Sequence, residues 1–143
     1  MKPLSYIGIS AGVEPGCENL VLMCMDFRFH RRLGDVLGFA GYREFDVLAM
    51  PGSSKALCES ASRGLILDSI ATAIAVHGVK RVLIVDHVDC RAYGGSEACS
   101  DPDAEARMHE RALREAALIV LERFPDLEVV PVYAAWDYAY VVE

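Results

Sequence analysis

Residues 81–90 read RVLIVDHVDC, and they combine the clearest strand of the chain with two side chains that bind metals. The run Val82–Val85 is continuously apolar, which is typical of a parallel strand buried on both faces. His87 and Cys90 follow at once, so the strand leads into a chemically reactive segment. Ligands of open parallel sheets bind at the carboxyl ends of the strands. This stretch therefore predicts both an α/β fold and the place of its site.

A second strand of the same kind ends in a similar way earlier in the chain. Residues 19–24 form a mainly apolar run that ends in Cys24. Because the carboxyl ends of parallel strands share one edge of the sheet, we expect Cys24, His87 and Cys90 to converge there. Thiolates and imidazoles are the usual zinc ligands, and three protein ligands with one open position are typical of catalytic sites. The sequence therefore predicts a zinc site with an open fourth position.

The remaining segments alternate between helical and strand patterns, which indicates a parallel sheet with crossover helices. Ile66, Ile70 and Ile74 recur at intervals of four and mark one face of a helix that ends near His77. The predicted strands are 19–24, 44–50, 81–86 and 127–135, and the other predicted helices are 29–39 and 102–124. We expect one domain over residues 1–143, a three-layer α/β/α domain around a mainly parallel sheet of about four strands.

Composition narrows the class of protein. The chain has 143 residues, 53% of them hydrophobic and 24% charged, as expected for a folded domain. Its 14 basic and 21 acidic residues give a formal charge of -7, which argues against nucleic acid or an anionic membrane as a partner. No apolar segment reaches the roughly 18 residues of a membrane span, and the start does not resemble a signal peptide. We therefore expect a cytoplasmic protein.

Asp26 and Arg28 follow Cys24 at alternate positions. If this segment is extended, the three side chains project to the same side. Arg28 can then hold the Asp26 carboxylate by a bidentate contact. With this contact made, Asp26 orients a zinc-bound hydroxide; with it broken, Asp26 takes the fourth metal position and closes the site. The sequence leaves both states open.

Cys-x-Asp-x-Arg at one strand end and His-x-x-Cys at a later one together resemble the β-carbonic anhydrases. The resemblance implies that Cys24, His87 and Cys90 bind Zn²⁺, and that Asp26 and Arg28 act as the dyad described above. It implies a carbonate dehydratase, a zinc lyase that reversibly hydrates carbon dioxide to bicarbonate by attack of zinc-bound hydroxide. It also implies a small-molecule substrate and a homodimer or higher homo-oligomer.

Three departures from the family pattern touch the wall of the expected pocket. Arg91 stands where the family usually has glycine, and Asp86 stands where a small residue usually precedes the histidine. Residues 50–54 read MPGSS in place of an Asn-Gly or Ala-Gly stretch. Arg91 and Asp86 either form an ion pair beside the metal, or Arg91 offers a contact to an anion.

Two alternative functions use the same residues. One is a hydrolase of carbon disulfide or carbonyl sulfide, which are linear electrophiles like carbon dioxide. The other is a non-catalytic zinc-binding protein in which Asp26 is a permanent fourth ligand. The zinc coordination shell and a substrate comparison would separate the three functions.

Several further residues carry weaker expectations. His30 either transfers protons at the pocket mouth or is a solvated residue at a helix start. We expect His109 to be solvated on a charged helix face, and Asp89 to be a turn residue without a chemical role. The aromatic tail, residues 136–143, is expected to dock on the domain or on a second subunit.

Overall fold

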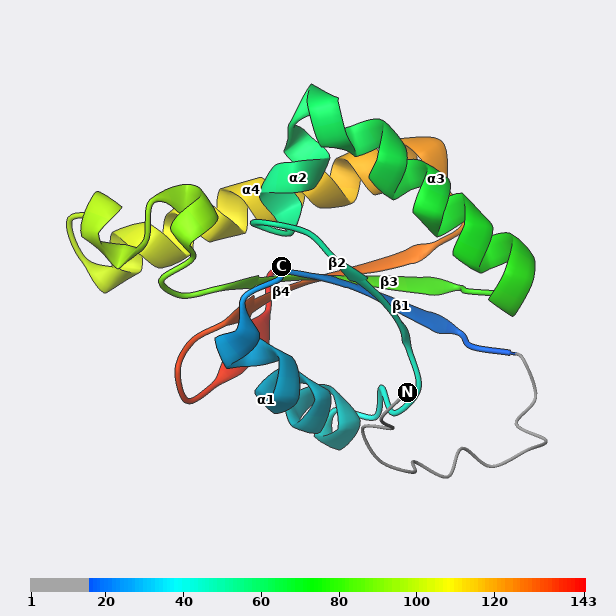
Figure 1. Ribbon diagram of the computed structural model, residues 1–143, viewed down its shortest axis with the longest axis horizontal. Helices are drawn as coiled ribbons and strands as arrows, with labels where there is room; N and C mark the ends of the chain where they lie inside the picture. Colours follow the sequence, from blue (N-terminus) through cyan, green and yellow to red (C-terminus); the bar gives the residue numbers. More distant parts are fainter. Residues whose placement is uncertain (1–15) are drawn as a thin grey trace, which may run out of the picture.

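The computed structural model describes residues 16–143, which form a central sheet covered by helices on both faces (Figure 1). The strands are β1 (Asn19–Met23), β2 (Asp46–Ala49), β3 (Arg81–His87), β4 (Glu128–Ala134) and β5 (Ala139–Val141). The helices are α1 (Phe27–Phe39), α2 (Ser54–Cys58), α3 (Ser60–His77) and α4 (Pro102–Arg123), and short 3₁₀ helices span Arg91–Tyr93 and Ser96–Ala98. None of the helices within 16–143 has both the length and the apolar character to cross a membrane.

The sheet has the strand order β2-β1-β3-β4-β5. The first four of these strands in the sheet are mutually parallel, and β5 pairs antiparallel with β4. The predicted mainly parallel α/β sheet is therefore confirmed. The additional strand comes from the tail, which turns back after β4 through a hydrogen bond from the Ala135 amide to the Tyr138 carbonyl, at 2.8 Å. The tail thus docks on its own domain.

Two apolar cores lie on opposite faces of the sheet, as the layers in Figure 1 suggest. Strand β3 supplies both, because successive side chains of a strand point to opposite faces. Val82 and Ile84 pack in the core beneath α2, α3 and α4, whereas Leu83 and Val85 pack in the core beneath α1. This two-sided burial explains why the β3 sequence is continuously apolar and confirms the three-layer prediction.

The helix ends follow the expected capping rules. Helix α3 ends at Gly78, which adopts a left-handed conformation with φ 74°. Asp101 caps α4 by accepting a hydrogen bond from the Ala104 amide, and Pro102 occupies the first helical position. Helix α1 begins at Phe27, two residues earlier than predicted, because Asp26 caps it. The segment after β1 is therefore not extended as far as Arg28.

The buried state of His109 contradicts the sequence prediction. Its side chain is fully buried beneath α4 rather than solvated. Glu105, one helical turn earlier, is 2% exposed. The charged pattern of the α4 sequence concealed this face, because polar side chains that satisfy one another inside the protein look like solvated ones in a sequence.

Candidate metal centre

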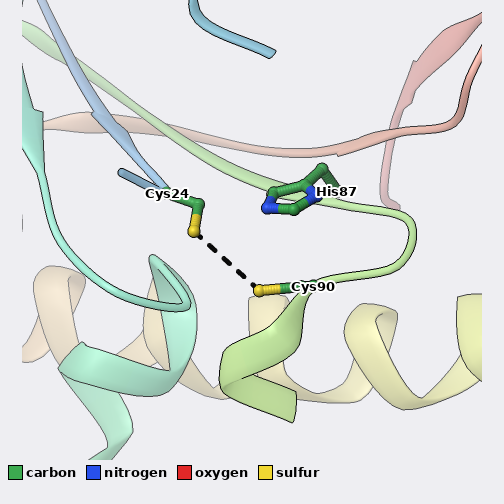
Figure 2. A group of neighbouring side chains, drawn as sticks. All are labelled: Cys24, His87 and Cys90. Carbon is green, nitrogen blue, oxygen red and sulfur yellow. Dashed lines mark hydrogen bonds between the residues drawn. The ribbon is translucent and has the colours of Figure 1, made fainter. Parts of the chain in front are cut away.

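Cys24, His87 and Cys90 meet at the carboxyl edge of the sheet, as the sequence predicted (Figure 2). Cys24 follows β1, His87 ends β3, and Cys90 lies in the turn after β3. The two Sγ atoms are 3.9 Å apart, and one potential ligand atom from each residue lies within 4.8 Å of the others. All three side chains are buried. Neighbouring parallel strands thus bring together residues that are 63 positions apart.

The geometry of this cluster fits a zinc ion. Two Zn–S bonds of about 2.3 Å at a tetrahedral angle place two sulfur atoms about 3.8 Å apart. The observed separation of the Cys24 and Cys90 sulfurs is 3.9 Å. His87 Nδ1 lies 2.8 Å from the Val88 carbonyl, to which it can donate, and His87 Nε2 is buried without a hydrogen-bond partner. Such an orientation of the imidazole leaves the Nε2 lone pair free for a metal.

The protein stabilises negative charge on Cys24. The hydrogen bond with Cys90 is the largest cause of a lowered pKa at Cys24, with His87 and the Gly52 amide adding to it against burial. The same contact, together with burial, raises the pKa of Cys90. The Gly52 amide lies 3.4 Å from the Cys24 sulfur. Gly52 has φ +74°, and a Cβ there would lie 3.0 Å from Ala92 Cβ, so the turn that presents this amide favours glycine.

Arg28 holds the carboxylate of Asp26 beside the cluster. Its Nε atom lies 3.0 Å from Asp26 Oδ1, and its Nη2 atom lies 2.6 Å from Asp26 Oδ2. Hydrogen bonds from Arg28 lower the pKa of Asp26 to about 2. Asp26 Oδ2 lies 4.0 Å from His87 Nε2. The Asp26–Arg28 contact is therefore made in this structure, with the carboxylate ionised and next to the potential ligands.

A second carboxylate, Asp89, also binds Arg28, and the sequence did not predict it. Arg28 Nη1 lies 2.9 Å from Asp89 Oδ2, and Arg28 Nη2 donates to the Asp89 carbonyl at 3.0 Å. Asp89 adopts a left-handed backbone conformation with φ 54°, which aspartate tolerates better than most residues. Its position next to Cys90 was the one available signal, but the contact spans 61 residues.

Asp86 does not pair with Arg91, contrary to one of the two expectations for these residues. Its side chain faces away from His87 across β3, and its 2% exposure marks it as part of the interior. Ser54 Oγ lies 2.6 Å from Asp86 Oδ2, and His109 Nδ1 lies 2.9 Å from the same atom. Arg91 instead points outward. Its nearest carboxylates are Asp89 at 3.9 Å and Glu97 at 3.8 Å.

Aromatic side chains form the wall of the site on the α1 side. The Phe29 ring lies 4.2 Å from the His87 ring, centroid to centroid, and 5.4 Å from the Trp136 ring. The Arg28 guanidinium carbon lies 5.3 Å from the centre of the Trp136 ring. The tail thus supplies a side chain next to the dyad. His30 is exposed, and its Nε2 lies 3.2 Å from the Cys24 carbonyl.

Crystal structures of β-carbonic anhydrases share this fold. Isoform I from the protozoan Trichomonas vaginalis aligns with a TM-score of 0.64 over 96% of this chain and 87% of that one, at 15% identity. A structure from a study of two tetrameric β-carbonic anhydrases of the ascomycete Sordaria macrospora gives 0.63 over 90% and 82%, also at 15% identity. The fold is therefore that of the β-carbonic anhydrases.

Sequence comparison places the chain more narrowly. A family model described as "Putative carbonic anhydrase" matches residues 15–142, nearly the whole chain. Two relatives, both uncharacterized proteins, are 30% identical over 119 residues, or 78% of this chain. The match spans 73% of the Rickettsia bellii (strain RML369-C) protein and 64% of the Rickettsia conorii (strain ATCC VR-613 / Malish 7) protein. The chain belongs to this carbonic anhydrase family.

Proposed function

We propose that the protein binds one Zn²⁺ through Cys24, His87 and Cys90 and reversibly hydrates carbon dioxide to bicarbonate. The observation that carries the proposal is the buried donor set, with two sulfurs 3.9 Å apart and an imidazole Nε2 without a partner. The family and the fold support it. A zinc ion in such a site supplies a Lewis acid that brings the pKa of a coordinated water close to neutrality.

The dyad gives the chain its own part in this reaction. Arg28 keeps Asp26 ionised, so the carboxylate only accepts hydrogen bonds. We expect Asp26 Oδ2, which lies 4.0 Å from His87 Nε2, to accept a hydrogen bond from the attacking water and so to orient a lone pair of that water. The same contact argues against a permanently closed site, because Asp26 is occupied by Arg28 rather than turned fully toward the ligands.

A homo-oligomer and a cytoplasmic location belong to the same proposal. Met25 and Phe27 flank Asp26 and are 59% and 85% exposed, so apolar side chains face outward directly beside the site. A second copy that covers them would remove this surface from water. One of the related crystal structures comes from a study of enzymes described as tetrameric.

The experiment measures zinc content and carbon dioxide hydration by stopped flow on the same preparation. We expect one equivalent of zinc per chain and hydration activity, both lost in Cys90→Ser. The matched control is Cys99→Ser, because Cys99 lies outside the cluster and is partly exposed. Full zinc occupancy without hydration at neutral and mildly alkaline pH would refute the proposed reaction. Release of sulfide from carbon disulfide or carbonyl sulfide in that case would assign the alternative substrate.

A further inference from the structure

Asp89 is held in place by hydrogen bonds with Ser96 of its own loop and with Glu105 of α4. Its amide donates to Glu105 Oε1 at 2.7 Å, and its Oδ1 atom accepts from the Ser96 amide at 3.0 Å. Ser96 Oγ in turn donates to Glu105 Oε2 at 2.8 Å. Glu105 is 2% exposed and belongs to α4, so this anchor is part of the packed domain. The left-handed turn at Asp89 is therefore held by Glu105 and Ser96, independently of its contact with Arg28.

Arg28 joins this anchor to Asp26. Within residues 16–143, every hydrogen-bond donor to the Asp26 carboxylate belongs to Arg28: its backbone amide, its Nε and its Nη2. The other side of the guanidinium donates from Nη1 and Nη2 to the Asp89 carboxylate and carbonyl. Trp136 covers the guanidinium plane at 5.3 Å. The position of Asp26 therefore depends on where Arg28 is held, and Asp89 is the partner that holds it.

We propose that Asp89 is a positioning residue that, by anchoring Arg28, keeps Asp26 away from the metal and the fourth coordination position open. This inference rests on the proposed zinc site. Asp26 Oδ2 lies 4.0 Å from His87 Nε2, so a modest rotation brings the carboxylate to the ligands. Without Asp89, Arg28 loses its charged contact to the loop while its side chain remains 29% exposed to solvent. The guanidinium then moves more freely, and Asp26 is released toward the metal.

Cobalt substitution tests this placement without a measurement of activity. Co²⁺ in place of zinc gives a visible spectrum that changes when thiocyanate enters an open coordination position. We expect the wild-type spectrum to respond to thiocyanate and Asp89→Asn to bind it about tenfold more weakly, because a charge-assisted contact of this kind is lost. Asp89→Gly suits the left-handed turn and keeps the backbone carbonyl, so it is a second variant should the first not fold.

Two comparisons complete the test. Glu97→Gln removes one negative charge from the same loop without touching Arg28, and we expect thiocyanate binding as in the wild type. Asp26→Ala combined with Asp89→Asn should restore binding, because the competing carboxylate is gone. Equal thiocyanate affinity in the wild type, Asp89→Asn and Asp89→Gly would overturn the proposed role of Asp89 but not the proposed zinc site. A wild-type cobalt site that ignores thiocyanate would overturn both proposals, whereas a responsive site without carbon dioxide hydration would overturn only the proposed function.

Discussion

His109 Nδ1 lies 2.9 Å from Asp86 Oδ2, and the side chains are 0% and 1% exposed. This contact joins α4 to β3 at the residue that precedes His87. Ser54 donates to the same carboxylate from its amide at 3.0 Å and from its hydroxyl at 2.6 Å. Its hydroxyl also lies 2.7 Å from the Tyr93 hydroxyl. A buried polar network thus ties the helices to the strand that carries a potential metal ligand.

Replacement of Asp86 should strongly destabilise the fold. We expect Asp86→Ala to lower the free energy of unfolding by about 3 kcal/mol, because the buried donors of Ser54 and His109 lose their acceptor. Urea unfolding followed by circular dichroism measures this change. The control is Asp68→Ala on the exposed side of α3, with an expected effect within about 0.5 kcal/mol. Equal effects of the two substitutions would contradict the structural role of the network.

The Asp26 carboxyl should stay ionised in acid as long as Arg28 is present. Its pKa is lowered to about 2 by hydrogen bonds from Arg28. A lowered carboxyl pKa means that the associated stability is present above the ordinary value of about 3.9 and is lost as the pH falls toward 2. Carbon NMR of the side-chain carboxyl in the metal-free protein measures this titration.

In the same titration, Arg28→Ala should bring the pKa of Asp26 back toward its ordinary value. Arg111→Ala, which removes an exposed arginine of α4, should leave it unchanged. Titration of wild-type Asp26 near pH 4 would show that the bidentate contact does not persist in solution.

Trp136 offers a fluorescence reporter of the dyad, because it is the one tryptophan in the sequence. Its ring lies 5.3 Å from the Arg28 guanidinium carbon and stacks on Phe29. We expect Arg28→Ala to shift the emission maximum to longer wavelength, since the ring loses part of its cover and meets more water. Arg111→Ala should leave the spectrum unchanged. An unchanged spectrum in Arg28→Ala would mean that the tail does not cover the dyad.

Replacement of glycine by alanine should change the stability of the protein in opposite directions at two positions. Gly95 has φ +74°, and an added Cβ would lie 2.9 Å from Asp89 Oδ1 and 3.0 Å from Arg91 Nη1. Gly34 lies inside α1, with nothing within 4 Å of an added Cβ. We expect Gly95→Ala to destabilise the protein by at least about 1 kcal/mol and Gly34→Ala to stabilise it by roughly 0.5 to 1 kcal/mol. Thermal unfolding measures both, and stabilisation by Gly95→Ala would contradict the tight turn.

Much of the fold was predictable because its signals are local. Buried parallel strands need continuous apolar runs, and the four parallel strands lie within the residues predicted for them or differ by one position at an end. The short β5 was not predicted, because three residues carry little pattern and their pairing with β4 is set by the turn before them. The start of α1 was predicted two residues too late, because Asp26 was expected to act in the site and not also to cap the helix.

The sequence by itself determined the meeting of Cys24, His87 and Cys90, because residues that follow parallel strands must share one edge of the sheet. Only the tertiary structure decided that Arg28 binds both Asp26 and Asp89, and that His109 is buried against Asp86. These contacts depend on strand register and on how α1 and α4 pack, which bring polar groups from distant segments to within hydrogen-bond distance. In a sequence, a charged residue that pairs with a buried partner cannot be distinguished from one that faces water. Burial and pairing are therefore visible only in the folded structure.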